Sequence, residues 1–186
     1  MIASRFERTI LLLFLTILGG AWISFSRESS STTEGSVLAE APIVGHLAPD
    51  FTLQTAIGES VSLTDHVDRS GDQGRPVVLN YWASWCGPCR VETPELQDAS
   101  LKYKNRVAII GVNQGETPAT ITKFGTSFGL NYPLLVDENN VVNQLYGVVG
   151  LPTTVFIDRK GIVREVFVGI LSQATLQERI ERLLAD

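Results

Sequence analysis

The chain of 186 residues contains two cysteines, Cys86 and Cys89, separated by Gly87 and Pro88. Two thiols at this spacing can form a structural disulfide, contribute to a metal site or exchange disulfides with another molecule. A bridge that closes so short a loop restricts the unfolded chain little, so it would be a weak structural staple. The spacing therefore favours redox chemistry over a structural role.

A metal site at these cysteines would need more ligands, because two thiolates make only half of a tetrahedral zinc set. The two histidines, His46 and His66, do not stand at a spacing that completes the set. We expect neither a metal nor another cofactor. Thiolates are soft ligands, however, so a tethered copper- or zinc-binding metallochaperone stays as an alternative function.

The sequence around the cysteines predicts a strand followed by a helix. Residues 76–83 form an apolar run, as expected for a strand covered on both faces, and residues 87–104 read as a helix. Cys86 therefore opens the helix, where free backbone N–H groups and the helix dipole stabilise a thiolate. We expect Cys86 to be the nucleophile and Cys89, one turn along, to resolve the mixed disulfide. Gly87 permits the tight turn, and Pro88 suits the first helical turn.

The elements beyond this helix indicate an α/β fold. A second apolar run at 107–112 predicts a strand parallel to the first, joined to it by a right-handed crossover. Ser172 stands where a helix N-cap belongs, before apolar residues that recur on one helical face. The other predicted elements are helices at 117–128 and 140–146, a strand at 133–136, and a hairpin of strands 153–158 and 162–168.

The motif Trp85-Cys86-Gly87-Pro88-Cys89 matches the active-site motif of the thioredoxin superfamily. The chain further resembles the TlpA/ResA-like branch of membrane-anchored thiol-disulfide oxidoreductases, which is similar to CcmG/DsbE. The resemblance lies in the segment 80–85, Glu92, the segment Gly150-Leu151-Pro152-Thr153-Thr154 and the apolar N-terminus. The resemblance covers residues 43–186. It implies a thioredoxin-like fold, in which helices flank a central mixed β-sheet.

The resemblance also implies which residues meet a client protein. Pro152 should be the cis-proline that faces the cysteines, leaving nearby main-chain groups free to pair with an extended peptide. An apolar rim that includes Ile170 should surround the site. The expected substrate-binding residues are Trp85, Gly87, Pro88, Gly150, Leu151 and Gly169.

Glu92 is the candidate for proton transfer. Ordinary thioredoxins, which this chain resembles, carry a buried aspartate at the position of Asn80, and an amide cannot replace its function. Glu92 lies one turn after Cys89 on a stripe that is otherwise apolar, so burial should raise its pKa towards that of a thiol. The alternative is a solvated Glu92 paired with Arg90.

The N-terminus predicts a membrane anchor. Residues 9–26 are uncharged and as a helix would reach about 27 Å, close to the thickness of a hydrocarbon core. Arg5 and Arg8 precede them, which favours a cytoplasmic N-terminus. We therefore expect residues 1–26 to be a cytoplasmic start and transmembrane signal anchor, 27–42 a flexible linker and 43–186 the thioredoxin-like domain. The alternative, a cleaved signal peptide, fits poorly because Ala39-Glu40-Ala41 lies far beyond the apolar run.

These expectations place the domain outside the cytoplasm on a single-pass protein of the bacterial inner membrane. Gly-Pro between the cysteines is the dipeptide of reducing thioredoxins, so we expect a reductant of protein disulfides. The resemblance implies a membrane thiol reductase of the CcdA or DsbD type as electron donor, and apocytochrome c or proteins of oxidase copper-site assembly as clients. A net charge of −5 gives no basic surface for nucleic acid.

A peroxiredoxin-like peroxidase is a further alternative, because residues 48–53 resemble the opening of peroxiredoxins. That family places a proline seven residues and a threonine three residues before its reactive cysteine. This chain has Leu79 and Ala83 there, which cannot position or polarise a peroxide. The sequence therefore favours disulfide exchange.

Overall fold

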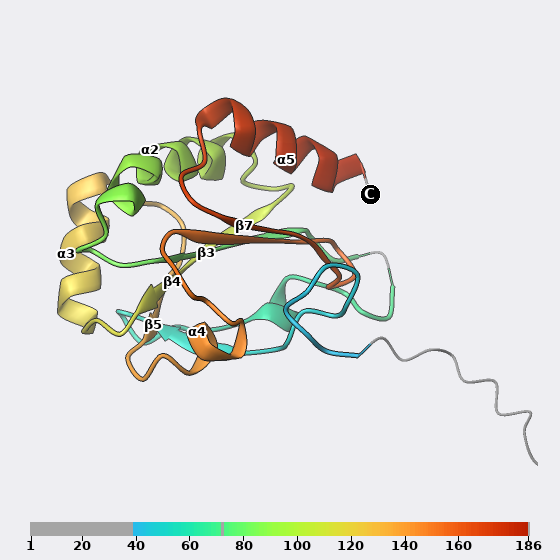
Figure 1. Cartoon of the computed structure of the whole chain (residues 1–186), viewed down its shortest axis with the longest axis horizontal. Helices are drawn as coiled ribbons and strands as arrows, with labels where there is room; N and C mark the ends of the chain where they lie inside the picture. Colours follow the sequence, from blue (N-terminus) through green and yellow to red (C-terminus); the bar gives the residue numbers. More distant parts are fainter. Residues whose placement is uncertain (1–38, 72, 186) are drawn as a thin grey trace, which may run out of the picture. The chain divides into compact units, whose positions relative to one another are not determined.

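The computed structural model describes residues 39–71 and 73–185. Within these residues seven strands form one mixed sheet in the order β2-β1-β5-β4-β3-β6-β7 (Figure 1). The strands are β1 (Thr52–Thr55), β2 (Ser60–Ser62), β3 (Val77–Trp82), β4 (Ala108–Gln114), β5 (Leu134–Asp137), β6 (Thr153–Ile157) and β7 (Val163–Val168). The helices are α2 (Gly87–Lys102), α3 (Pro118–Phe128), α4 (Val141–Leu145) and α5 (Gln173–Ala185), with a short 3-10 helix, η1 (Leu63–Asp65).

The centre of the sheet has the predicted strand, helix, strand order. β3 and β4 are parallel and α2 connects them, while β5 is parallel to β4. β6 and β7 form the predicted antiparallel hairpin and extend the sheet beyond β3. The thioredoxin-like α/β fold with a central mixed sheet is thereby confirmed.

The central strand β3 is buried on both faces, which explains its continuous apolar sequence. Val77, Leu79 and Tyr81 point into the core beside α4. Val78 on the opposite face joins the core under α2 and α5. Figure 1 shows α2 and α5 on one side of the sheet and α4 on the other. The end of β3 is thereby held between two layers, immediately before the cysteine motif.

Helix α2 buries the stripe that the sequence predicted. Glu92, Leu96, Ala99 and Tyr103 are each at most 3% exposed. The apolar members of the stripe pack in one cluster with α5, which contributes Leu176, Ile180 and Leu183. Ser172 accepts a hydrogen bond from the Thr175 N–H at 3.2 Å, as expected of an N-cap. The stripe therefore fixes α2 and draws Glu92 out of solvent.

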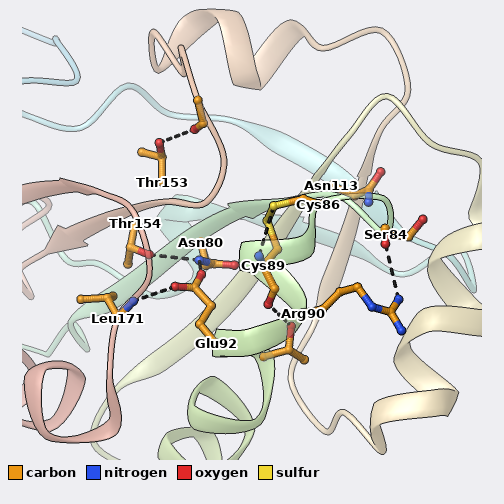
Figure 2. The surroundings of a disulfide bond; sticks show 12 residues. Asn80, Ser84, Cys86, Cys89, Arg90, Glu92, Asn113, Thr153, Thr154 and Leu171 are labelled. Carbon is orange, nitrogen blue, oxygen red and sulfur yellow. Dashed lines mark hydrogen bonds between the residues drawn. A yellow bond between two sulfur atoms is a disulfide. The ribbon is translucent and has the colours of Figure 1, made fainter.

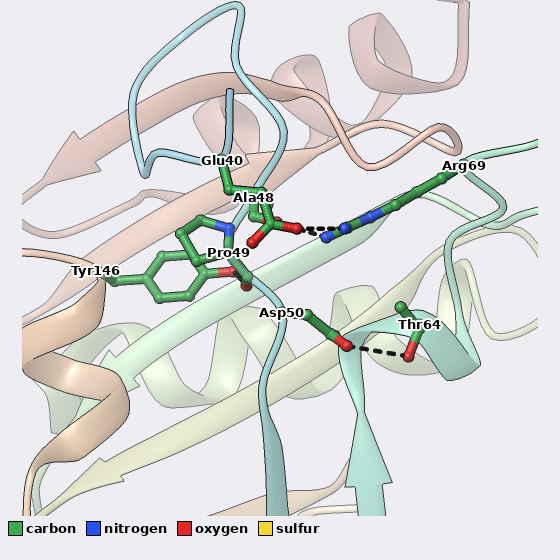
Figure 3. Close-up of polar contacts among 7 residues, drawn as sticks. All are labelled: Glu40, Ala48, Pro49, Asp50, Thr64, Arg69 and Tyr146. Carbon is green, nitrogen blue, oxygen red and sulfur yellow. Dashed lines mark hydrogen bonds and ion pairs between the residues drawn. The ribbon is translucent and has the colours of Figure 1, made fainter. Parts of the chain in front are cut away.

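The start of the described chain is fastened to the domain by two side chains (Figure 3). The Arg69 guanidinium donates to Glu40 Oε1 at 2.6 Å and to the Ala48 carbonyl at 2.7 Å. The Tyr146 hydroxyl donates to the Pro49 carbonyl at 2.7 Å. Tyr146 follows α4 directly, so this bond also supports the beginning of the loop that leads to Pro152.

The predicted transmembrane segment 9–26 and residues 27–38 of the predicted linker lie outside the described residues. In the part of the chain that is described, no helix is long and apolar enough to cross a membrane. Glu40, near the end of the predicted linker, contacts the domain through Arg69 and through a bridge to Leu47.

Candidate active site

Cys86 and Cys89 are joined in a disulfide at the amino end of α2 (Figure 2). Cys86 is the N-cap residue, and its sulfur accepts a hydrogen bond from the Cys89 N–H at 3.1 Å. Pro88 occupies the first turn, where a missing N–H costs no helical hydrogen bond. Free N–H groups and the helix dipole at this end favour negative charge on Cys86 once the disulfide opens.

An open pocket of about 340 Å³ lies against Cys86, and Cys89 is not among its lining residues. Its walls come from three segments: residues 85–88 of the motif, Gln114 at the end of β4, and the loop 148–151. None of these described lining residues carries a charge. We call this the client pocket. It makes Cys86 the sulfur that an outside molecule would reach.

The loop before β6 lies beside the cysteine motif, with the Leu151–Pro152 peptide bond in the cis form, as predicted. The Gly169 N–H donates to the Pro152 carbonyl at 2.9 Å, which joins this loop to the end of β7. Thr153 Oγ1 donates to the Gly150 carbonyl at 2.7 Å. Gly150 and Leu151 line the client pocket, whereas Gly169 and Pro152 lie outside its lining.

Several exposed apolar side chains surround this region. Trp85 is 68% exposed and Val149 is 93% exposed, and both line the client pocket. Val168 and Ile170 are also exposed. Trp85 and Ile170 were predicted from the sequence, whereas Val149 was not. Its signal in the sequence is an apolar pair immediately before the Gly-Leu-Pro segment.

Glu92 is buried at 1% exposure and accepts two hydrogen bonds from other elements. Asn80 Nδ2 on β3 donates to Glu92 Oε1 at 2.7 Å, and the Leu171 N–H before α5 donates to Oε2 at 3.0 Å (Figure 2). Burial raises the pKa of Glu92 from 4.5 to about 7, although both hydrogen bonds act to lower it. This buried carboxyl group can therefore exchange a proton near neutral pH.

Asn80 has a second partner, since its Nδ2 also donates to Thr154 Oγ1 on β6 at 3.0 Å. The orientation of the amide is fixed by these two acceptors. Burial raises the pKa of the Tyr132 hydroxyl, and the nearby Glu92 charge raises it further. The alternative of a solvated Glu92 paired with Arg90 is wrong, because Arg90 donates to the Ser84 carbonyl instead.

A second pocket of about 700 Å³, larger than the client pocket, lies between β1, β5 and α4 and includes neither cysteine. Chemistry therefore identifies the site better than pocket size does. Among residues 39–71 and 73–185, no cluster of three or more metal-ligating side chains occurs. His66 lies against Arg75, and His46 against the Val44 carbonyl.

The cysteine pair lies at the amino end of a helix in a thioredoxin-like fold, and a buried carboxyl group follows one turn later. This arrangement defines a thiol-disulfide oxidoreductase. The family model described as the AhpC/TSA family matches residues 44–166, so the chain belongs to that family. Enzymes that exchange disulfides carry the electrons on their own sulfurs and use no separate cofactor.

The relatives agree with this class. Thiol-disulfide oxidoreductase ResA of Geobacillus thermodenitrificans is 34% identical over 177 residues, which cover 95% of this chain and 94% of that protein. The thioredoxin-like protein YneN of Bacillus subtilis is 32% identical over 140 residues, which cover 74% of this chain and 78% of that protein. A crystal structure from Chlorobium tepidum, described as a thiol:disulfide interchange protein DsbE, has 33% identity and a TM-score of 0.68, covering 76% of this chain and 98% of that one.

Proposed function

We propose that this chain is an extracytoplasmic reductant of protein disulfides, held at the bacterial inner membrane by residues 9–26. The arrangement of the two sulfurs carries the proposal: Cys86 faces an uncharged pocket, whereas Cys89 stands one turn before a buried carboxyl group. One sulfur is thus open to a client, and the other has a proton acceptor nearby.

In the first step the Cys86 thiolate attacks one sulfur of a client disulfide. The client S–S bond breaks, the second client sulfur leaves as a thiolate, and a mixed disulfide joins Cys86 to the client. The helix dipole at the start of α2 stabilises the attacking thiolate. The uncharged pocket accommodates the side chains beside the client cysteine.

In the second step the Cys89 thiol gives its proton to the Glu92 carboxylate, and the resulting thiolate attacks the Cys86 sulfur. The mixed disulfide breaks, and the reduced client leaves with the electron pair on its sulfur. The enzyme retains the Cys86–Cys89 disulfide, so two electrons have moved to the client. Glu92 then returns its proton to solvent or to the leaving thiolate.

The exposed apolar residues around the client pocket would bind the client chain. Trp85 and Val149 offer exposed apolar surface from two different segments that line the pocket beside Cys86. The loop containing Leu151 and Pro152 would present its main chain to an extended client segment, as in other peptide complexes formed through strand addition. Gly169, bound to Pro152, would support that edge.

An enzyme that reduces disulfides outside the cytoplasm must itself be reduced from the cytoplasmic side. A membrane thiol reductase of the CcdA or DsbD type is the proposed donor. Proposed clients are apocytochrome c and proteins of oxidase copper-site assembly, whose cysteines must be reduced before they bind haem or copper.

The test uses the reduced full chain in a non-ionic detergent with insulin as the disulfide substrate. We expect the wild type to reduce insulin and Cys89→Ser to stop as a covalent adduct through Cys86 that dithiothreitol releases. Cys86→Ser should form no adduct. An adduct in Cys86→Ser but not in Cys89→Ser would reverse the assigned roles, and a wild type inactive on insulin but active on hydrogen peroxide would favour the peroxidase.

A further inference from the structure

Glu116, in the loop between β4 and α3, binds the residue that precedes the cysteine motif. Its Oε2 accepts a hydrogen bond from the Ser84 N–H at 2.7 Å, and its Oε1 accepts one from the Ser84 hydroxyl. The two residues are 32 positions apart in sequence. Ser84 directly precedes Trp85, so Glu116 fixes the backbone from which that exposed side chain and Cys86 project.

Glu116 is itself held in place by Asn113, which is fully buried at the end of β4. Asn113 Nδ2 donates to Glu116 Oε2 at 2.7 Å, and the Glu116 N–H donates to Asn113 Oδ1 at 3.0 Å. The carboxylate therefore accepts three hydrogen bonds in a fixed orientation. Hydrogen bonds to a charged acceptor are stronger than those between neutral groups.

The third polar group of Ser84 is also bound. Arg90 Nη1 donates to the Ser84 carbonyl at 3.4 Å, and its guanidinium lies over the rings of Phe124 and Phe128 on α3. Figure 2 shows Ser84, Arg90 and Asn113 on the other side of the disulfide from Glu92. This group of residues is therefore separate from the proton-transfer group.

The contacts of Glu116 connect two walls of the client pocket. One wall is the motif segment that starts at Trp85, and another is Gln114, two residues before Glu116. We propose that Glu116 is a positioning residue that holds these two walls in a fixed relative position for client binding. The inference rests on the proposed function, because it assigns Glu116 to the binding of a protein disulfide. Glu116 makes none of the described hydrogen bonds to Cys86 or Cys89, so it acts through Ser84 and Trp85.

The test compares steady-state reduction of insulin, with dithiothreitol as the electron donor, by the full chain in detergent. Glu116→Ala removes all three acceptor contacts and should raise the KM for insulin by about ten-fold or more. The kcat and the direct reduction of the Cys86–Cys89 disulfide by dithiothreitol should change by less than about two-fold, because the sulfurs themselves are untouched.

Glu116→Gln separates hydrogen bonding from charge. A glutamine oxygen can accept from the Ser84 N–H and Asn113 Nδ2, while its amide donates to the Ser84 hydroxyl, so all contacts can be kept. We expect a KM within about three-fold of the wild type. Ser84→Ala, which removes only one contact, should lie between the two, and Glu138→Ala at an exposed position is the matched control.

A wild-type KM in Glu116→Ala would overturn the inference, as would equal impairment in Glu116→Gln. A variant that loses reactivity with dithiothreitol has lost its fold, and Ser84→Ala with Glu116→Gln then decide the question. A wild type that reacts with dithiothreitol but never reduces insulin would instead contradict the proposed function.

Discussion

The buried carboxyl group of Glu92 should make the stability of the oxidised protein depend on pH. Its pKa is about 7 in the folded chain against 4.5 for the unperturbed group, and burial is the main cause. The folded state therefore binds this proton more tightly than the unfolded state does. A rise of this size corresponds to about 3 kcal/mol at ~1.4 kcal/mol per pKa unit.

The direction of the effect follows from these two pKa values. The contribution of the Glu92 proton to the free energy of unfolding is complete below pH 4.5. It is lost as the pH rises towards 7, and it stays lost above that. Glu92→Gln removes the ionisable group, and its amide nitrogen faces one of the two donors, Asn80 Nδ2 or the Leu171 N–H. That mismatch should cost about 1–3 kcal/mol at every pH.

The assay is guanidinium unfolding of the oxidised full chain in a non-ionic detergent at pH 4 and at pH 8, followed by circular dichroism. The free energy of unfolding of the wild type minus that of Glu92→Gln should fall by about 3 kcal/mol between these pH values. Glu138→Gln serves as the matched control. A difference that varies by less than about 1 kcal/mol would refute the argument that burial holds a proton on Glu92.

Three further predictions concern the proton on Glu92, its contact with Asn80, and the buried carboxylate of Asp137. Resolution of the mixed disulfide by Cys89 should accelerate as the pH rises through about 7, since only ionised Glu92 accepts a proton. Stopped-flow exchange should show this rise in rate in the wild type but not in Glu92→Gln. An unchanged pH profile in the variant would exclude proton transfer to Glu92. Asn80→Asp replaces the donor 2.7 Å from Glu92 with a second carboxyl group, so the two carboxyl groups should share one proton. The variant should therefore be destabilised by about 3 kcal/mol or more at pH 8 and by less at pH 5. Equal losses at both pH values in denaturant titrations would contradict this. Asp137→Ala removes an acceptor for the Val141 N–H, the Asn143 N–H and Asn143 Nδ2, each at 2.8 Å, and should cost about 2–4 kcal/mol with faster hydrogen exchange in α4. Unchanged exchange in α4 would show that Asp137 does not hold this helix.

The buried elements were predicted well from the sequence, because their patterns arise from local chemistry. The apolar run of β3 and the buried stripe of α2 are found where the spacing placed them. Strands β1 and β2 were not predicted. They are short and largely Ser, Thr and Gln, and β1 joins the sheet by pairing with β5 while β2 pairs with β1 at the edge. Their place in the sheet therefore depends on β5 rather than on their own sequence.

The site was predicted unevenly for a similar reason. Cys86, Cys89 and Glu92 share one helix, and their spacing alone brings them together. The contact between Ser84 and Glu116 joins positions 32 residues apart, and no periodicity in the sequence indicates it. Asn80 was recognised only as unable to transfer a proton, whereas the structure gives it a role in orienting Glu92 through its bonds to Glu92 and Thr154.

The reduction potential of the Cys86–Cys89 couple tests the central claim most directly. It can be measured by equilibrating the full chain in detergent with glutathione or dithiothreitol buffers and trapping the thiols. A reductant with the Gly-Pro dipeptide of thioredoxins should have a potential near that of thioredoxin, about −270 mV. A potential near that of DsbA, about −120 mV, would make the protein an oxidant and contradict the proposed direction of electron flow.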